Sequence, residues 1–348
     1  RFGLREALPS KEFICAHTCL QVLAALEDAL AADWTWKRQT SRLVESMTGA
    51  KFWVVKKKPT PSRGQRLPNT ASSIFKYFAV FPRELTRARA IPMRVRMYSV
   101  DNVLHKRLEE IGHQPSGYVA HFEQGVELEH EFDGDRLFFT GVKDVGGHLR
   151  SICNHLEAAA DSTFMVLPEC TVCPTMMEDI KSAISSSPLP PVLCLAGSFH
   201  CRDDPSKLPY NRGELIDYRG ERVGKVIKSA PASLGMNGQE GISVEETMDL
   251  VSTPLGLVGL AICLDFSHPT QAVWEEVEPD WMLVPSMGDQ RTLDVHRDAA
   301  EKLRNTFNTT SLIANQPAEG AGHPGFIVEK GVEHNEDHHN QVVSLTSK

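Results

Sequence analysis

The spacing of hydrophobic residues changes near residue 125 and predicts two kinds of structure along this chain. Before that point, hydrophobic positions recur every three or four residues, as they do in helices that bury one face. Beyond it, short apolar runs alternate with helical patterns, which is typical of an α/β unit. We therefore expect a basic, mainly helical region over residues 1–125 and an α/β domain over residues 126–348.

Individual elements follow from the same patterns. In the first region, helices are predicted over residues 10–34, 35–47, 74–90 and 99–112. The stretch 54–73 is basic and rich in Pro, Gly and Ser, and is expected to form a loop. In the second region, strands are predicted over 136–142, 163–169, 190–199, 279–287 and 311–315, with a hairpin over 212–228 and a strand pair over 248–266. The intervening helices are predicted over 148–161, 174–186, 269–278 and 293–310.

Composition and charge refine this division. The hydrophobic fraction of 41% and the charged fraction of 24% are those of a soluble globular protein, and no apolar run is long enough to span a membrane. Residues 1–125 hold 20 Lys and Arg against 11 Asp and Glu, whereas residues 126–348 hold 17 against 34. The eight cysteines lack disulfide-framework spacing, which favours a reducing, cytoplasmic setting. Since the chain begins at Arg1, we expect further residues upstream.

Three polar residues each close an apolar strand or hairpin. Glu169 ends the segment FMVLPE, Lys228 ends GKVIK, and Cys263 lies in LAICLDF. Strand ends lie side by side in a sheet, and α/β proteins usually carry their sites there. A carboxylate, an ammonium and a thiol brought together suffice for acyl transfer. Each residue alone is more often a core thiol or a solvated strand end.

The surrounding segments resemble the three signature blocks of the nitrilase, or carbon–nitrogen hydrolase, superfamily. HLEAAADSTFMVLPE is similar to the block that closes in Pro-Glu, and PYNRGELIDYRGERVGKVIK to the hairpin that ends in a catalytic lysine. TPLGLVGLAICLDFSHP is similar to the block that carries the nucleophile. The later segment that ends at Asn315 also follows the family pattern, so the resemblance covers roughly residues 135–340.

The resemblance implies a role for each of these residues. Cys263 would be the nucleophile, Glu169 the general base and acid, and Lys228 the stabiliser of the oxyanion, with the backbone N–H of Leu264 as a second donor. Lys225 is the rival for the lysine role. Because positions three apart on a strand face opposite ways, Lys225 and Lys228 cannot both face the site, and Lys228 closes the motif.

Other positions are less certain matches to the family pattern. Relatives often carry a second glutamate between the lysine and cysteine blocks, and Glu240 is nearest to that spacing, ahead of Glu245 and Glu246. An acidic surface loop is the alternative for all three. The sequence departs from the family at Leu264, where an aromatic residue is common, and at FSHP, which places His268 near the mouth of the site.

The resemblance also implies a fold and partners. The α/β unit would be a four-layer α-β-β-α sandwich that forms a homodimer or larger oligomer and hydrolyses a small-molecule amide or nitrile, with no metal or organic cofactor. Two alternatives remain. One is an inactive nitrilase fold that acts as an oligomerisation scaffold. The other is a nucleic-acid-associated effector that binds through residues 1–125, such as a fragment of a reverse transcriptase–nitrilase defence fusion, although no Tyr-x-Asp-Asp motif is present.

Two metal-site alternatives are weaker. Cys170, Cys173, Cys194 and Cys201 invite a zinc interpretation, but the spacing lacks a second Cys-x2-Cys pair. The histidines of the segment 334–339 are more typical of a solvated loop near the C-terminus.

Overall fold

The computed structural model describes most of the chain from residue 92 onward and two short segments before it. The described residues are 52–56, 78–86, 92–112, 114–233, 238–267, 271–316, 323–329, 332–334 and 339–345. The helices predicted over 10–34 and 35–47, and the candidate site residue His268, lie outside these ranges.

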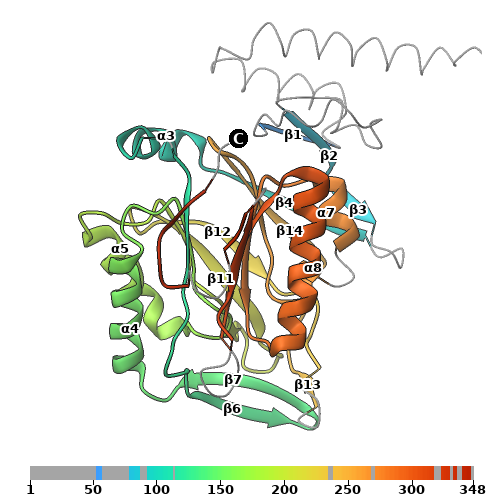
Figure 1. The fold of residues 1–348 in the computed structure, drawn as a ribbon. Coiled ribbons are helices and arrows are strands. Elements are labelled where there is room, and N and C mark those ends of the chain that lie inside the picture. The colour runs from blue at the N-terminus through green and yellow to red at the C-terminus, as the bar shows by residue number, and fades with distance from the viewer. Residues whose placement is uncertain are drawn as a thin grey trace, which may run out of the picture.

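Two large sheets form the centre of the structure (Figure 1). The first sheet has seven strands: β20 (Val343–Ser344), β5 (Ser116–Val119), β8 (Phe164–Val166), β9 (Leu193–Leu195), β11 (Tyr210–Asp217), β10 (Phe199–Cys201) and β12 (Arg222–Ile227). β5, β8 and β9 run parallel to one another. β11 pairs antiparallel with β9, β10 and β12. The β11–β12 hairpin turns at Gly220, whose φ of 79° suits a residue without a side chain.

The second sheet has eight strands. In spatial order they are β19 (Val332–His334), β18 (Phe326–Glu329), β17 (Thr310–Asn315), β16 (Trp281–Ser286), β15 (Gly256–Leu260), β14 (Thr247–Thr253), β4 (Pro92–Ser99) and β3 (Glu84–Thr86). The central strands β15, β16 and β17 are parallel, and β14 is parallel to β4. The C-terminal ends of the three central strands therefore lie at one edge of the sheet.

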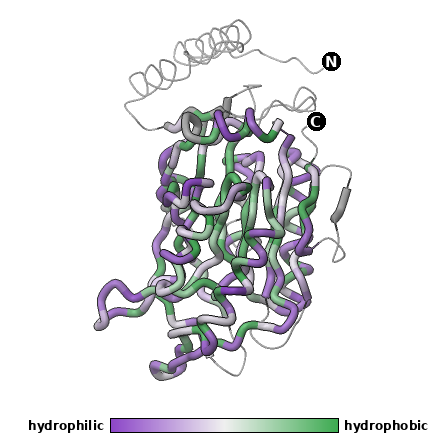
Figure 2. The backbone as a smooth tube through the Cα atoms, turned by 90° about the vertical axis from the view of Figure 1, so that its left-hand side faces the viewer, coloured by the Kyte–Doolittle hydropathy of each residue, from purple (hydrophilic) through white to green (hydrophobic). Residues whose placement is uncertain are grey.

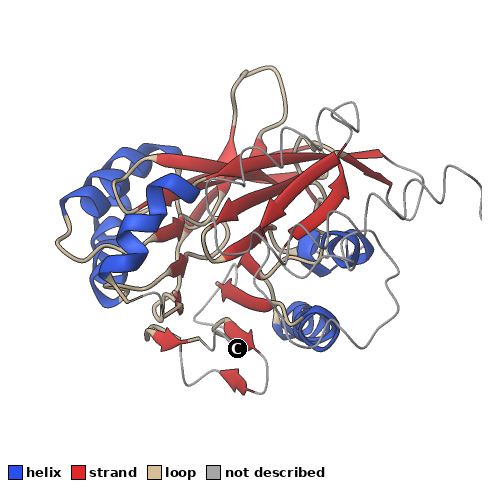
Figure 3. Ribbon diagram, turned by 90° about the horizontal axis from the view of Figure 1, so that it is seen from above, coloured by secondary structure: helices blue, strands red, loops and turns tan. Residues whose placement is uncertain are grey.

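The described helices are α3 (Asp101–Glu110), α4 (Val145–Ala158), the 3-10 turn η3 (Pro174–Met176), α5 (Met177–Ser186), α6 (Leu264–Ser267), α7 (Gln271–Val277) and α8 (Gln290–Phe307). α4 and α5 cover the outer face of the first sheet and α7 and α8 that of the second, whereas Leu104 and Leu108 of α3 pack into the core between the sheets. Figure 3 shows the helices on the two outer sides with the strands between them. None of the helices described is long and apolar enough to cross a membrane.

Three hydrophobic cores separate the four layers. Alternate residues of a strand face opposite ways, so Phe164 and Val166 of β8 pack between the two sheets while Met165 packs beneath α4 and α5. On the other side, Met282 and Val284 of β16 pack under α7 and α8. Figure 2 shows hydrophobic positions through the interior and hydrophilic positions on the outer loops. The predicted α-β-β-α sandwich is confirmed.

Smaller strands complete the described chain. β6 (Leu128–Asp133) and β7 (Arg136–Val142) form a hairpin at the lower end of the sandwich in Figure 1, and β13 (Gln239–Glu240) adds to β7 in parallel. β1 (Phe52–Lys56) and β2 (Phe78–Pro82) pair antiparallel.

The predicted helix over residues 74–90 is wrong within its described part. Residues 78–82 and 84–86 are the strands β2 and β3. The aromatic and β-branched residues of this segment fit a strand, and β2 pairs with β1 across more than twenty residues of intervening sequence. Periodicity within one segment does not reveal such a distant partner. The described end of the predicted loop, residues 54–56, likewise belongs to β1.

The predicted domain boundary between residues 125 and 126 separates strands that belong to the same sheet, in both large sheets. β4 lies in the second sheet and β5 in the first, although both precede residue 125. The helix predicted over 99–112 is present as α3. The described part of residues 92–125 is therefore built into the sandwich rather than into a separate helical unit.

Candidate active site

The three residues predicted at strand ends meet where the two sheets face each other. Glu169 follows β8, Lys228 follows β12, and Cys263 follows β15. All three are buried, with at most 3% of the residue exposed. The backbone N–H of Glu169 donates to the carbonyl of Ser286 at 3.3 Å, and that of Cys263 donates to the carbonyl of Pro285 at 2.8 Å. Since these carbonyls are consecutive on β16, Glu169 and Cys263 lie beside each other.

A second set of hydrogen bonds joins the lysine to the cysteine. Asp265, two residues after Cys263, accepts from the backbone N–H of Ser229 at 2.8 Å and from its hydroxyl at 2.9 Å. Ser229 directly follows Lys228. The end of β12 is thereby fixed to the short helix α6 that begins after the cysteine.

Lys228 lies between two buried carboxylates. Its Nζ donates to Oε1 of Glu169 and to Oε2 of Glu240, both at 2.7 Å. Lys225 is half-buried and sits opposite Glu214 in the β11–β12 register, away from these carboxylates. Of the two lysines that the sequence offered, the structure brings Lys228 to Glu169.

Glu240 is the glutamate that reaches the site. It lies in β13 and is 5% exposed, whereas Glu245 pairs with Arg96 at 2.8 Å on a different part of the molecule. Besides Lys228, the backbone N–H of Ala232 donates to Oε2 of Glu240 at 2.8 Å. The acidic-surface-loop alternative is therefore wrong for Glu240.

Two polar residues of this network were not identified from the sequence. The Asn211 amide donates to Oε1 of Glu169 at 2.8 Å and to Oε1 of Glu240 at 2.9 Å. Nε2 of His200 lies 3.0 Å from the same Glu240 oxygen. Asn211 stands in the Tyr-Asn pair before the hairpin, and His200 interrupts an apolar strand. A polar residue within the apolar strand β10 is the signal that could have identified His200, whereas β11 also carries Arg212 and Glu214, so polarity alone does not single out Asn211.

The hydrogen bonds of His200 determine its tautomer. The backbone N–H of Phe139 donates to Nδ1 at 2.9 Å, so Nδ1 carries a lone pair. The proton of the neutral ring is then on Nε2, which donates to Glu240. A histidine fully buried between these two partners fixes the position of the carboxylate that holds Lys228.

We expect the free energy of unfolding of a His200→Ala variant to be about 1–3 kcal/mol lower than that of the wild type. The variant loses the hydrogen bonds from His200 to Glu240 and from the N–H of Phe139 to His200. Urea denaturation measures the difference. His130→Ala, on the exposed face of β6, is the control and should change stability by less than about 0.5 kcal/mol. Equal stability of His200→Ala and wild type would contradict this assignment.

The charges of the cluster stabilise one another. Burial by itself opposes the charged form of Lys228, but the carboxylates of Glu169 and Glu240 hold its pKa well above the ordinary value. Burial likewise opposes ionisation of Glu240, whereas Lys228 and the His200 hydrogen bond hold the pKa of that carboxyl below its usual range. The lysine is thus a cation and Glu240 a carboxylate at neutral pH.

Glu169 has one oxygen engaged and one open. Its Oε1 accepts from Lys228 and Asn211, whereas its buried Oε2 has no hydrogen-bond partner among the described residues. A buried carboxylate oxygen whose lone pairs accept no hydrogen bond is well placed to accept a proton from a nearby donor.

Cys263 lies on a turn rather than within the strand. β15 ends at Leu260, and α6 begins at Leu264. The cysteine has a φ of 48°, in the left-handed region that non-glycine residues rarely adopt and that is common at functional sites. Within the described chain, the backbone N–H of Leu264 donates to no backbone acceptor. This N–H is available to an oxygen near the thiol.

Burial raises the pKa of the Cys263 thiol to about 12, and the Glu169 charge adds to this effect. Lys228 and hydrogen bonds from Ser286 and the backbone of Met287 act in the opposite direction. The thiol is therefore protonated at neutral pH. A nucleophilic role requires a base that removes the proton as the sulfur attacks.

Behind the cysteine, His296 joins two serines. Its Nε2 lies 3.2 Å from the Ser286 hydroxyl and its Nδ1 lies 2.9 Å from the Ser267 hydroxyl. Burial and then the Lys228 charge lower the pKa of this fully buried histidine to about 3, so it is neutral. It connects α8 to β16 and α6 immediately behind the turn that carries the thiol.

The zinc interpretation of the cysteines is not supported. Over the described part of the chain, which includes Cys170, Cys173, Cys194 and Cys201, no group of three or more potential ligands is arranged to hold a metal ion. Of the histidines of the segment 334–339, His338 lies outside the described residues.

Comparison with known proteins gives structural similarity alone, since no family model and no curated protein matches the sequence. Nit3 of Saccharomyces cerevisiae, a member of branch 10 of the nitrilase superfamily, shares 14% identity with a TM-score of 0.45, covering 66% of this chain and 88% of its own. An amidase of Nesterenkonia sp. AN1 shares 14% identity with a TM-score of 0.49, covering 67% of this chain and 91% of its own. The NitFhit protein of C. elegans shares 16% identity with a TM-score of 0.45, covering 66% and 59%. Solved structures to which the chain is similar thus include members of the superfamily that its sequence motifs resemble.

Proposed function

We propose that this protein hydrolyses a non-peptide carbon–nitrogen bond of a small molecule, an amide rather than a nitrile, through a thioester on Cys263. The observation that carries the proposal is the buried cluster in which Lys228 bridges two carboxylates while Oε2 of Glu169 remains unpartnered beside the cysteine. A purely structural ion pair would not explain why Oε2 of Glu169 lacks a hydrogen-bond partner or why the backbone of Cys263 adopts a left-handed conformation.

The first half of the reaction forms the thioester. Oε2 of Glu169 takes the thiol proton as Sγ of Cys263 attacks the carbonyl carbon, which explains how a thiol with a pKa of about 12 can react at neutral pH. The carbonyl oxygen becomes an oxyanion, which Lys228 and the backbone N–H of Leu264 stabilise. Glu169 then donates its proton to the leaving nitrogen, the C–N bond breaks, and the amine departs.

The second half releases the acid. Glu169, again a carboxylate, takes a proton from water as the water oxygen attacks the thioester carbon. The C–S bond breaks, the acid leaves, and the proton returns to Cys263. Glu240 takes no part in proton transfer in this scheme. It holds Lys228 charged and in position, and Asn211 and His200 in turn hold the two carboxylates.

We expect an acyl adduct on wild-type protein in intact-mass spectra recorded after acid quenching of reactions with a panel of amides and nitriles. Because the adduct is a thioester on Cys263, it should be missing in Cys263→Ala. It should persist in Cys153→Ala, the control, because Cys153 lies half-buried on α4 away from the site. If no member of the panel gives an adduct or is hydrolysed, the inactive scaffold becomes the better interpretation.

The remaining sequence-based expectations stay predictions. They are self-association through a helical face, a cytoplasmic location, and nucleic-acid binding through residues 1–125, of which residues 1–51 lie outside the described chain. Because β4 and β5 belong to the two sheets, a deletion that tests nucleic-acid binding should remove residues 1–51 rather than 1–125.

A further inference from the structure

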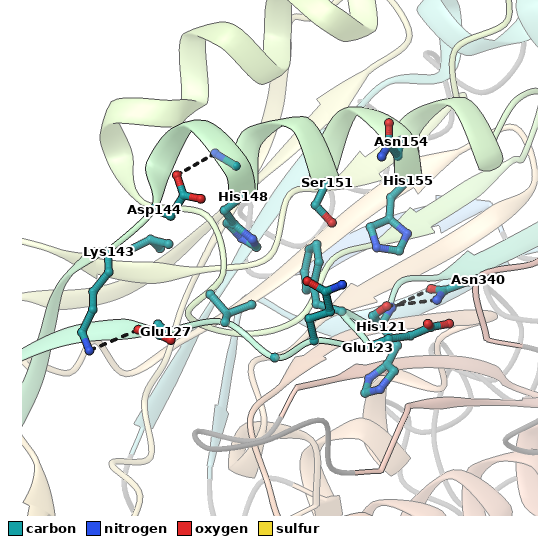
Figure 4. A pocket seen from close by; sticks show the side chains of 16 residues that line it. His121, Glu123, Glu127, Lys143, Asp144, His148, Ser151, Asn154, His155 and Asn340 are labelled. Atoms are coloured by element: carbon teal, nitrogen blue, oxygen red, sulfur yellow. Dashed lines mark hydrogen bonds and ion pairs between the residues drawn. The ribbon is translucent and has the colours of Figure 1, made fainter.

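A cavity of about 670 Å³ lies between α4 and the segment that follows β5. Its lining comes from residues 121–127, from 142–144 at the end of β7, from one face of α4 and from Asn340 (Figure 4). This volume is in the range of small-molecule sites. Glu169, Lys228 and Cys263 do not line it, so it is separate from the candidate active site.

One wall of the cavity is aromatic. His148, Ser151 and His155 share a face of α4 and point toward the loop 121–127 in Figure 4. The ring of Phe122 packs against both imidazoles, with ring centroids 4.6 Å from His148 and 4.9 Å from His155. Phe122 is 4% exposed, so it fixes the positions of the two imidazoles, and the imidazoles and Ser151 form the surface of this wall.

The same wall carries a vacant hydrogen-bond acceptor. Nε2 of His148 lies 2.7 Å from the carbonyl of Thr171, which can only accept, so the ring proton is on Nε2. His148 is 9% exposed, and burial lowers its pKa. The ring is therefore neutral, and its Nδ1 carries a lone pair that can accept a hydrogen bond. No partner for Nδ1 occurs among the described residues. His121 also has one ring nitrogen at a backbone carbonyl, in this case Nδ1 at 3.2 Å from the carbonyl of Asn315.

The charged lining residues favour a cation. Among the described residues of the lining, Lys143 is the one lysine or arginine, and its Nζ pairs with Glu127 at 3.3 Å. Glu123 and Asp144 add two carboxylates, of which Asp144 also accepts the N–H of Gly147 at the start of α4. With neutral imidazoles and an excess of carboxylates, the cavity suits a ligand that donates hydrogen bonds and carries positive charge.

We propose that this cavity binds a small organic ammonium ion. The ammonium group donates to Nδ1 of His148 beside the carboxylate of Asp144, while the carbon body lies along the face of α4 that carries Ser151 and His155 (Figure 4). This site does not depend on the proposed hydrolysis, because none of its residues takes part in that reaction.

Isothermal titration calorimetry with three probes of one shape tests the charge preference. The probes are 2-phenylethylammonium chloride, neutral 2-phenylethanol, and sodium 3-phenylpropanoate. We expect the ammonium ion to bind at least about tenfold more tightly than the alcohol, equivalent to about 1.4 kcal/mol, and the carboxylate not to bind. Equal affinity for the ammonium ion and the carboxylate, or no binding of the ammonium ion, would overturn the proposal.

Variants locate the site. Ser151→Trp fills the cavity and should abolish binding, and Asp144→Asn should weaken it about two- to fivefold, the effect of one solvent-exposed ion pair. Asparagine can still accept the N–H of Gly147 at the start of α4, so this second variant keeps the test valid if Ser151→Trp does not fold. Glu157→Gln, on the exposed side of α4 and outside the lining, is the matched control and should bind as the wild type does.

A catalytic-site variant completes the test. Cys263→Ser should bind the ammonium ion with unchanged affinity, because the cavity is separate from the thiol. Loss of binding in Cys263→Ser, or wild-type affinity in both folded Ser151→Trp and Asp144→Asn, would overturn the assignment to this cavity.

Discussion

A Lys228→Met variant is expected to lose about 3–5 kcal/mol of unfolding free energy, the usual effect of removing one partner from a buried ion pair. Methionine matches the unbranched lysine side chain as far as Cε but leaves Glu169 and Glu240 facing each other without the shared cation. The variant should also lose hydrolysis, because the oxyanion loses its charged donor. Urea denaturation with circular dichroism measures the stability difference.

The stability difference should depend on pH in a defined direction. In the wild type, the lowered pKa of Glu240 contributes stability above the ordinary glutamate pKa of about 4.3, and this contribution is lost as the pH falls. The deficit of Lys228→Met should therefore be fully present from neutral pH down to about pH 5 and shrink as the pH falls below about 4.3. Lys207→Met, an exposed lysine in a polar turn, is the control and should change stability by at most about 1 kcal/mol. A deficit independent of pH would contradict the buried-cluster explanation.

Glu169→Gln is expected to lower the rate of hydrolysis by about 10²- to 10⁴-fold, the usual contribution of a general base. The amide keeps the size of the side chain and can still accept from Lys228, but it cannot take the thiol proton. Since the same group acts in both halves of the reaction, formation and hydrolysis of the thioester should both slow. Single-turnover measurements separate the two steps.

Alkylation of Cys263 by iodoacetamide gives the matching pH dependence. With a thiol pKa of about 12, loss of the base leaves only the thiolate to react, so the rate in Glu169→Gln should rise about tenfold per pH unit between pH 7 and 10. In the wild type, Glu169 supplies the base, and the rate should be faster and nearly flat over this range. Glu157→Gln is the control with wild-type behaviour, and parallel pH profiles in wild type and Glu169→Gln would contradict the assignment.

The site is assembled from both sheets. β8 and β12 of the first sheet bring Glu169 and Lys228, and β15 of the second sheet brings Cys263. Hydrogen bonds from Glu169 and Cys263 to consecutive carbonyls of β16 then fix their separation. The cluster is buried within the contact between the sheets, so its electrostatics depend on that contact being formed.

Local patterns were sufficient for most elements after residue 125. The continuous apolar runs of β8 and β9, the hairpin turn at Gly220 and the helical spacing in α8 all agree with the structure, because each reflects the burial or the turn of one element alone. The patterns failed before residue 92, where the described β2 and β3 replace a predicted helix. There the deciding contact is with β1, and no short window of sequence contains both strands.

The sequence by itself determined that Glu169, Lys228 and Cys263 lie at or just beyond the ends of strands, because each of these polar residues closes an apolar segment. Strand alternation allows only one of Lys225 and Lys228 to face the site, and Lys228 was favoured because it closes the segment that resembles the family's lysine block. The resemblance placed Glu240 ahead of Glu245, and the tertiary structure decided against the surface-loop alternative by burying Glu240 against Lys228. Only the tertiary structure revealed that Asn211 and His200 hold the cluster. These contacts join residues up to 42 positions apart, such as Asn211 and Glu169, so their partners are set by how the sheets pack rather than by local spacing.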